Sequence, residues 1–259
     1  MSDLNRESFI SLYLSAASAV PCLRDRAETF LSPDACEKLY LIADRLIDNA
    51  RRFNLTAILD PEDIVRKHLV DSLIPLALLL DYGIPAGEGI GADDILDVGT
   101  GAGFPLLPWA AVLPTEGVTL TGLDATGKKI THIRESAEYA SLPSVRAVQA
   151  RAEDAARGPM RESYPLVTAR AVAAMPVLVE LCAPFVARAG FFAALKARAD
   201  EEIESASRAA SLLGLAEPDV IRYELPGGDE RCLVLYKKRA LTPRRYPRPY
   251  AEITKQPLV

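Results

Sequence analysis

The sequence predicts an α/β protein with a seven-stranded, mostly parallel, doubly wound sheet and a helical N-terminal extension. From residue 93 onward, short apolar strands alternate with helical patterns, which is typical of a parallel sheet with helices on both faces. Residues 1–90 instead show mostly helical spacing of apolar residues. A glycine-rich turn follows the first predicted strand, at the sheet edge where open α/β sheets bind ligands.

The helical extension is expected to span residues 1–90. Ser32-Pro33 and Asp60-Pro61 each pair a capping residue with proline at the first helical position. Helices are therefore predicted from about Glu7 to Val20, from Pro33 to Phe53, and from Pro61 to about Tyr82. The segment 83–91 is rich in glycine and proline and indicates a linker.

A sheet domain is expected over residues 91–239, followed by a tail over 240–259. Its strands are predicted at 94–98, 118–123, 145–149, 165–169, 190–195, 219–224 and 231–237. Its helices are predicted at 104–113, 127–141, 175–186 and 200–213. The last two strands have no helix between them, so they are expected to close the sheet as a pair.

The glycine turn carries an acid and three glycines at alternate positions: Asp97, Gly99, Gly101 and Gly103. The dinucleotide fingerprint G-x-G-x-x-G does not fit, because Phe104 stands where its third glycine is needed. The spacing is instead typical of the first motif of S-adenosylmethionine-dependent methyltransferases. A glycine turn at a helix N-terminus lets backbone approach a ligand closely, although a plain structural turn is the alternative.

A second acid supports the cofactor interpretation. Asp124 ends the next apolar strand, 21 residues after Gly103. In doubly wound sheets an acid about 20 residues past the glycines holds the ribose of a nucleotide. The alternative is that Asp124 only caps the helix that starts near Thr126.

Composition narrows the class of protein. The chain has 259 residues, about half of them apolar, and no run of 18 apolar residues. The N-terminus lacks the layout of a signal peptide, and the four cysteines are far apart, so a cytoplasmic protein with reduced thiols and no metal site is expected. The net charge of −5 combines a basic segment from Lys237 onward with an acidic remainder, which excludes a uniformly basic nucleic-acid binder but allows a local basic surface.

Other residues are candidates for the same site. Ala152 and Glu153 follow the third strand, where an adenine lies in such a fold, although Glu153 is equally well a solvated loop acid. Arg170 ends the fourth strand and can hold a carboxylate or phosphate, or form an ordinary salt bridge. Lys128 and Lys129 open a helix, where cations are unfavourable, and thus hint at an anionic partner.

The absence of two motifs limits which atom of a base this protein could methylate. The fourth strand ends Ala169-Arg170-Ala171-Val172, without the Asn/Asp-Pro-Pro-Tyr motif used for exocyclic amines. No cysteine stands at a predicted strand end to attack a pyrimidine. A ring nitrogen such as guanine N7 carries no proton and needs mainly positioning, so the sequence permits N7 chemistry.

Several motifs in order resemble the RsmG (GidB) family of bacterial 16S rRNA guanine-N7 methyltransferases. They lie between about Leu39 and Leu258, and they read Asn54-Leu55-Thr56-Ala57-Ile58, His68-Leu69-Val70-Asp71-Ser72-Leu73, Asp97 to Pro105, Lys128-Lys129, Arg151-Ala152-Glu153, Arg170-Ala171, Lys196, Tyr246-Pro247-Arg248 and Lys255-Gln256-Pro257-Leu258. The resemblance implies 7-methylguanine as the product, in a hairpin loop of 16S rRNA near the decoding centre. The sequence departs from the family pattern at Leu106, at Ala197 and at Pro249-Tyr250-Ala251, where glycines are usual.

The resemblance, with the motifs, assigns a role to each candidate. The methionine end of S-adenosylmethionine is expected on Asp97, Gly99, Gly101, Gly103 and Phe104, its ribose on Asp124, its adenine on Ala152 and Glu153, and Arg170 nearby. The substrate side is expected to include His68, Asp71 and Ser72, although a structural role for His68 is the alternative. Phosphates are expected on Lys128, Lys129, Lys196, Arg244, Arg245, Arg248 and Lys255.

Two rival functions stay open: a small-molecule methyltransferase on the same fold, and a protein that binds S-adenosylmethionine and RNA without catalysis. The expected partner is 16S rRNA or the small ribosomal subunit. We expect a monomer without a membrane or metal partner.

Overall fold

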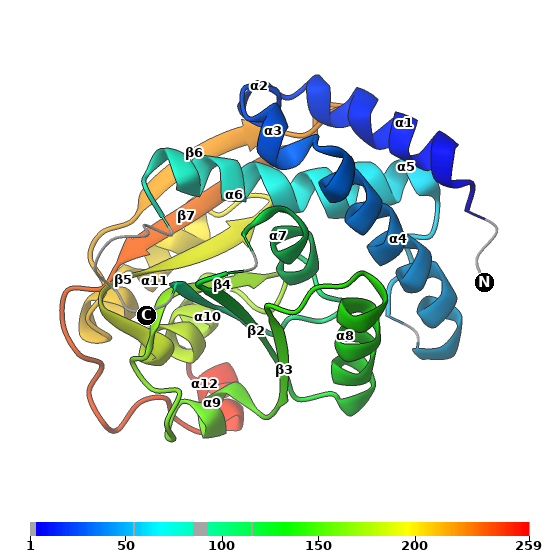
Figure 1. Ribbon diagram of the computed structural model, residues 1–259. Helices are drawn as coiled ribbons and strands as arrows, with labels where there is room; N and C mark the ends of the chain where they lie inside the picture. The colour runs from blue at the N-terminus through cyan, green and yellow to red at the C-terminus, as the bar shows by residue number, and fades with distance from the viewer. Residues whose placement is uncertain (1–3, 54, 85–92, 115, 259) are drawn as a thin grey trace.

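The computed structural model describes residues 4–53, 55–84, 93–114 and 116–258 (Figure 1). Asn54 of the first family-like motif, most of the predicted linker and the predicted boundary at residue 90 lie outside these ranges. The three-part division of the chain therefore stays a prediction.

The centre of the fold is a seven-stranded sheet in the order β3-β2-β1-β4-β5-β7-β6. The strands are β1 (Asp93–Val98), β2 (Val118–Asp124), β3 (Val145–Gln149), β4 (Tyr164–Arg170), β5 (Val186–Lys196), β6 (Asp219–Glu224) and β7 (Glu230–Lys237). The first five pair in parallel, and β7 pairs antiparallel with both β5 and β6. The predicted mostly parallel, seven-stranded α/β sheet is confirmed.

Helices cover both faces of the sheet (Figure 1). Those that follow strands are α7 (Leu106–Val112), α8 (Gly127–Tyr139), α9 (Ala152–Ala155), α10 (Met175–Cys182), η2 (Ala183–Phe185) and α11 (Asp200–Leu212), and α12 (Tyr250–Lys255) ends the chain. Neighbouring residues of β1 point to opposite faces, because side chains alternate along a strand. Ile95 thus joins the apolar cluster under α4, α7 and α8, and Leu96 joins the cluster under α10 and α11.

The N-terminal helices pack on one face of the sheet. They are α1 (Arg6–Ser18), α2 (Pro21–Arg24), α3 (Ala27–Phe30), α4 (Pro33–Phe53), α5 (Pro61–Ile64), η1 (Val65–Val70) and α6 (Asp71–Asp81). The predicted starts at both proline positions are confirmed, since Ser32 Oγ accepts from Ala35 N and Asp60 Oδ1 accepts from Asp63 N. Their buried residues share one apolar cluster with Ile95 and Leu120 of the sheet.

The third predicted helix contains an irregular turn. Residues Val65–Val70 form a π-helix between the α-helical segments α5 and α6. A π turn is wider than an α turn and is often found at functional sites. It directs both His68 and Asp71 toward one crevice, at the carboxyl edge of the sheet.

Other sequence predictions needed small corrections. The strand predicted at 190–195 begins at Val186, and the helix predicted to reach 186 ends at Cys182 and continues as η2. The short helices α2, α3, α9 and α12 were not predicted, because one turn is too short to show an apolar period. In the described part of the chain, no helix is long and apolar enough to cross a membrane, and no group of three metal-ligating side chains occurs.

Candidate active site

The glycine loop forms a tight backbone cradle between β1 and α7. All three glycines have positive φ: +71° at Gly99, +59° at Gly101 and +89° at Gly103. A Cβ on Gly99 would lie 2.6 Å from a methyl carbon of Val172, and one on Gly103 would lie 2.5 Å from Leu107 Cδ1. Gly99 and Gly103 therefore allow both the backbone turn and the close packing, which other residues hinder.

Asp97, near the end of β1, has one carboxylate oxygen without a hydrogen-bond partner among the described residues. This oxygen is Oδ2, and the side chain is almost fully buried. Burial raises the pKa of Asp97 to about 7, against the lowering effects of Thr100 and Arg170. Since an unpaired buried acceptor is costly, this oxygen is suited to accept from a ligand such as an ammonium group.

Asp124 bonds to the glycine loop and to the start of α8, and it lines a small cavity at this edge of the sheet. Its Oδ2 accepts from Gly101 N at 3.1 Å, and its Oδ1 accepts from Thr126 N at 2.8 Å. Thr126 is the N-cap residue of α8, so Asp124 does not cap that helix itself. Lys129 Nζ lies 3.5 Å from Asp124 Oδ2, which balances one cation at the start of α8.

A cavity of about 180 Å³ brings together four of the predicted cofactor residues, while Asp97, Gly101, Gly103, Phe104 and Arg170 lie outside its lining. Gly99, Asp124, Ala152 and Glu153 line it, and so does Tyr250 of α12. The remaining lining residues are Val98, Leu123, Ala125, Thr126, Ala150, Arg151, Val172 and Leu181. Apolar walls beside carboxylates fit an adenosine, and the orphaned oxygen of Asp97 fits the amino-acid end of S-adenosylmethionine.

Phe104 connects the glycine loop to the N-terminal helices. The rings of Phe104 and His68 stack, with centroids 4.5 Å apart and planes at 12°. The guanidinium carbon of Arg170 lies 5.5 Å from the Phe104 centroid. Burial, and next the charge of Arg170, lower the pKa of His68 to about 4, so this histidine is neutral at physiological pH. His68 Nε2 lies 3.2 Å from Thr56 Oγ1.

Asp71 binds two arginines from distant strands. Arg170 Nη1 donates to Asp71 Oδ2 at 3.3 Å, and Arg231 Nε donates to Asp71 Oδ1 at 3.2 Å. Arg170 Nη1 also donates to the Lys67 carbonyl at 3.4 Å. Burial raises the pKa of Asp71, and the charges of both arginines oppose that rise. Burial lowers the pKa of Arg170, although a guanidinium stays charged at neutral pH.

A crevice of about 470 Å³ lies beside these arginines. It is lined by Lys67, His68, Asp71, Arg170, Ala171, Leu195, Lys196, Ala197, Arg198, Glu202, Tyr223 and Arg231. The Tyr223 hydroxyl is buried without a hydrogen-bond partner in the described residues. The crevice thus combines the neutral ring of His68, which stacks on Phe104, with several cations and with the unpaired hydroxyl of Tyr223.

Ser72 does not line the crevice. It is fully buried, and its hydroxyl donates to the His68 carbonyl within the same run of helix. Trp109 Nε1 donates to the Ser72 carbonyl at 2.6 Å. These bonds indicate that Ser72 fixes the helix bearing His68 against α7.

Some of the predicted phosphate-binding cations are already paired. Lys196 Nζ lies 2.7 Å from Glu202 Oε2 and donates to the Ala173 carbonyl. Arg248 donates from Nη2 to Glu180 Oε2 at 2.6 Å, and Glu180 is fully buried. With Lys129 on Asp124, these contacts indicate structural roles, and their contact with RNA stays untested.

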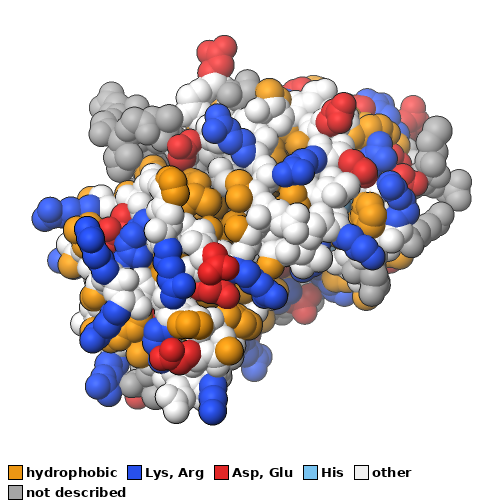
Figure 2. All heavy atoms as spheres, turned by 90° about the horizontal axis from the view of Figure 1, so that it is seen from below, with side chains coloured by type: hydrophobic (Ala, Val, Ile, Leu, Met, Phe, Trp, Pro, Cys, Tyr) orange, Lys and Arg blue, Asp and Glu red, His pale blue; other side chains and the backbone are white. Residues whose placement is uncertain are grey.

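Other predicted cations are exposed. Lys128, Arg244, Arg245 and Lys255 are exposed and make no ion pair with other described residues. The tail segment with Arg244 and Arg245 lies near the start of β4, since Arg161 Nη2 donates to the Thr242 carbonyl at 2.7 Å. Figure 2 shows Lys and Arg side chains gathered toward the left, the side on which this tail runs in Figure 1.

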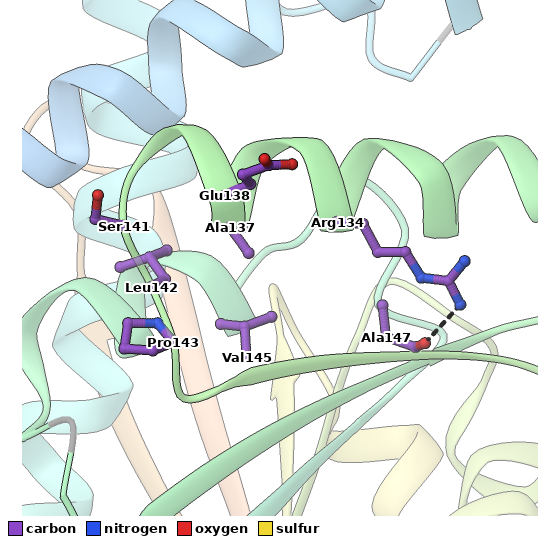
Figure 3. A pocket seen from close by; sticks show the side chains of 8 residues that line it. All are labelled: Arg134, Ala137, Glu138, Ser141, Leu142, Pro143, Val145 and Ala147. Carbon is purple, nitrogen blue, oxygen red and sulfur yellow. Dashed lines mark hydrogen bonds between the residues drawn. The ribbon is translucent and has the colours of Figure 1, made fainter.

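A separate cavity of about 560 Å³ lies between α8 and the edge strand β3 (Figure 3). Its walls are mainly apolar, and Arg134 Nη2 crosses it to donate to the Ala147 carbonyl at 3.1 Å. None of the predicted site residues lines it, so the chemistry belongs to the two cavities at the carboxyl edge.

Tyr223, Arg231 and Tyr250 line these cavities but were not predicted as site residues from the sequence. A usable signal existed for the first two residues, because an antiparallel last strand begins where its parallel neighbour ends. Cys232 of β7 pairs with Lys196 at the end of β5, which places Arg231 at the crevice. Tyr250 has no such signal, because it follows an irregular tail.

Comparisons with known proteins identify the family of this chain. The family model described as rRNA small subunit methyltransferase G matches residues 35–226. A protein of that name from Desulfitobacterium hafniense is 37% identical over 239 residues, covering 91% of this chain and 95% of the relative. One from Acetivibrio thermocellus is 36% identical over 230 residues, covering 88% and 90%.

A solved structure shows the same fold. The O-methyltransferase from Bacillus cereus, in complex with SAH, superposes with a TM-score of 0.54 at 16% identity, covering 88% of this chain and all of that one. This likeness supports the fold, while the sequence matches identify the family. The chain therefore belongs to the rRNA small subunit methyltransferase G family.

Proposed function

We propose that this protein transfers a methyl group from S-adenosylmethionine to N7 of a guanine in a hairpin loop of 16S rRNA. Family membership supports an rRNA methyltransferase that uses S-adenosylmethionine. The observation that carries the site assignment is the stack of His68 on Phe104. It joins the glycine cradle directly to the crevice that holds Asp71 and Arg170.

The cofactor is placed across the edge of the sheet. Asp97, the three glycines and Phe104 hold its methionine end, and Asp124 accepts from the ribose hydroxyls. Ala152 and Glu153 border the adenine in the cavity of about 180 Å³. When bound there, S-adenosylmethionine supplies an electrophilic methyl group on a positively charged sulfur.

N7 of guanine can take that methyl group without a general base. Its lone pair lies in the ring plane and carries no proton, so the protein must orient the base and exclude water. Positive charge moves from sulfur to the guanine ring during transfer. The neutral His68 adds no opposing charge, and the Asp71 carboxylate offsets part of the charge of Arg170 and Arg231 on this side.

We place the target guanine in the crevice beside Phe104. Asp71 orients Arg170 and Arg231, and the free hydroxyl of Tyr223 is available to the base. A base must leave its stack to enter, which costs least when it is unpaired, as in a loop. Lys128, Arg244, Arg245 and Lys255 are the exposed cations proposed to meet phosphates, and Lys129, Lys196 and Arg248 add charge nearby.

The deciding experiment is methyl transfer from radiolabelled S-adenosylmethionine to unmodified small-subunit rRNA, offered both naked and as assembled subunits. Borohydride and aniline then cleave the RNA at any 7-methylguanine. We expect one cleavage, in the hairpin loop near the decoding centre. The form of RNA that is labelled identifies the substrate, and sizing of the active species tests the proposed monomer.

Other outcomes separate the rival functions. If the RNA is labelled but not cleaved, the protein is a methyltransferase that acts on an atom other than guanine N7. If neither RNA is labelled although the cofactor binds, the protein acts on a small molecule or only binds its ligands. If the substrate is a small molecule, charge reversal at Arg244 and Arg245 should leave the activity unchanged.

A further inference from the structure

We propose that Tyr250, in the C-terminal tail, is a cofactor-binding residue that covers the adenosine end of the S-adenosylmethionine cavity. This inference rests on the cofactor placement proposed above. Tyr250 stands in the part of the tail where the sequence departs from the family pattern, at Pro249-Tyr250-Ala251.

The geometry of the cavity carries the proposal. Tyr250 lines the same cavity of about 180 Å³ as Asp124, Ala152 and Glu153. Asp124 ends β2, and Ala152 and Glu153 begin α9 after β3, whereas Tyr250 comes from the distant end of the chain. Figure 1 shows α12 beside α9, which carries Ala152 and Glu153. The tail therefore contributes one wall to a site otherwise built by the sheet edge.

The partial exposure of Tyr250 is explained by this position. It is 40% exposed, although a tyrosine ring is a large apolar surface. In the structure Tyr250 both lines the cavity and keeps contact with solvent. An adenine in the cavity gives such a ring a flat aromatic partner, and base–aromatic stacking is favourable with any base.

Contacts on both sides fix the position of Tyr250. Before it, Arg248 donates from its backbone nitrogen and from Nε to Glu180 Oε1, both at 2.9 Å. Arg157 Nη2 donates to the Pro247 carbonyl at 3.0 Å. After it, Ile253 is fully buried. The tail is thus ordered before the cofactor arrives, so that binding does not have to order it.

The test compares Tyr250→Ala with Tyr250→Phe by calorimetric titration. The probes are S-adenosylmethionine and 5′-methylthioadenosine, which shares the adenosine but lacks the amino-acid end. We expect Tyr250→Ala to weaken both by the same factor, about 5- to 30-fold, or about 1–2 kcal/mol. Tyr250→Phe keeps the ring and should stay within about twofold of the wild type.

Further measurements exclude a merely structural effect. Tyr250→Ala should raise the KM for S-adenosylmethionine and leave kcat at saturating cofactor unchanged. Tyr250→Leu, which keeps apolar bulk for packing, should still weaken binding. Tyr82→Ala is the matched control, because Tyr82 is 50% exposed and lies outside the cavity lining.

The outcomes are distinct. Equal affinity of wild type and Tyr250→Ala for both probes overturns the inference and leaves the cofactor site in place. Weaker binding of S-adenosylmethionine alone also overturns it, because the contact is then with the amino-acid end. If the wild type binds neither probe, the proposed function itself fails.

Discussion

Asp97 combines deep burial, an unpaired oxygen and a pKa raised to about 7. If it accepts from the ammonium group of S-adenosylmethionine, binding requires its ionised form. We expect cofactor affinity to rise as pH rises from 5.5 to 7.5, by roughly tenfold per pH unit well below 7. Calorimetric titration of the apo protein over this range measures the slope.

Asp97→Asn is the control for that slope. It keeps the shape of the side chain and removes the titration, so it should bind the cofactor weakly at every pH. A wild-type affinity that is flat from pH 5.5 to 7.5 contradicts the placement of the ammonium group at Asp97.

Asp71 is expected to act on the substrate side. Replacing it with alanine frees Arg170 and Arg231 from their common carboxylate. We expect kcat/KM for RNA to fall by about 10- to 100-fold, since misplacing groups in a site is costly. Cofactor affinity, measured by titration, should stay within about twofold. A collapse of cofactor binding shows instead that Asp71 supports the glycine loop.

At the residue scale, the sequence revealed the cofactor side better than the substrate side. Asp97 and Asp124 end parallel strands at a spacing that follows from the fold, so their neighbourhood could be predicted. Asp71 could be named, and the antiparallel last strand gave a signal that Arg231 lies at the same edge of the sheet. Their contact could not be predicted, because it also depends on how the N-terminal helices pack on the sheet, which local patterns do not encode.

At the element scale, periodicity predicted the helix around His68 but missed its π turn. The turn from Val65 to Val70 is buried on several sides, so apolar residues stand at helical spacing on either side of it. The π turn packs against α1, and just after it the Ser72 carbonyl accepts a hydrogen bond from Trp109 of α7. Neither appears in a sequence pattern.

The tail depends on one buried ion pair. Glu180 of α10 is fully buried, and within the described residues Arg248 is the one side chain that donates hydrogen bonds to it. Arg248→Ala leaves a buried carboxylate unpaired, and breaking such a pair costs about 3–5 kcal/mol. We expect a loss near the lower value, because the tail can move away and admit water. Urea unfolding measures it.

Two variants test the cause of that loss. Arg245→Ala, in the same tail but exposed, should change the free energy of unfolding by less than about 0.5 kcal/mol. The double variant Glu180→Leu with Arg248→Met should recover much of the stability, because no charge is then left buried. Equal losses in Arg248→Ala and Arg245→Ala contradict an anchoring role for the pair.

At the scale of the whole molecule, three buried groups give folding a definite pH dependence. Burial lowers the pKa of His68 and of His132 to about 4, from 6.5 when unfolded. Between those values the unfolded chain binds two protons that the folded chain does not. Burial raises the pKa of Asp97 from 3.8 to about 7, so the folded chain there binds one proton that the unfolded chain does not. These three groups give the unfolded state a net excess of just under one proton near pH 5, and the raised pKa of Asp71 reduces this excess.

Stability should therefore rise as pH rises from 5 to 6.5, most steeply near pH 5, at about 1 kcal/mol per pH unit, and less steeply toward pH 6.5 as the unfolded histidines lose their protons. Urea unfolding at intervals of pH measures this slope. Asp97→Asn removes the opposing proton, so its slope should be steeper, at about 2.4 kcal/mol per pH unit where it is steepest. The double variant His68→Gln with His132→Gln leaves only the two acids and should reverse the sign. A double variant that keeps the wild-type slope shows that other groups govern the acid sensitivity of this fold.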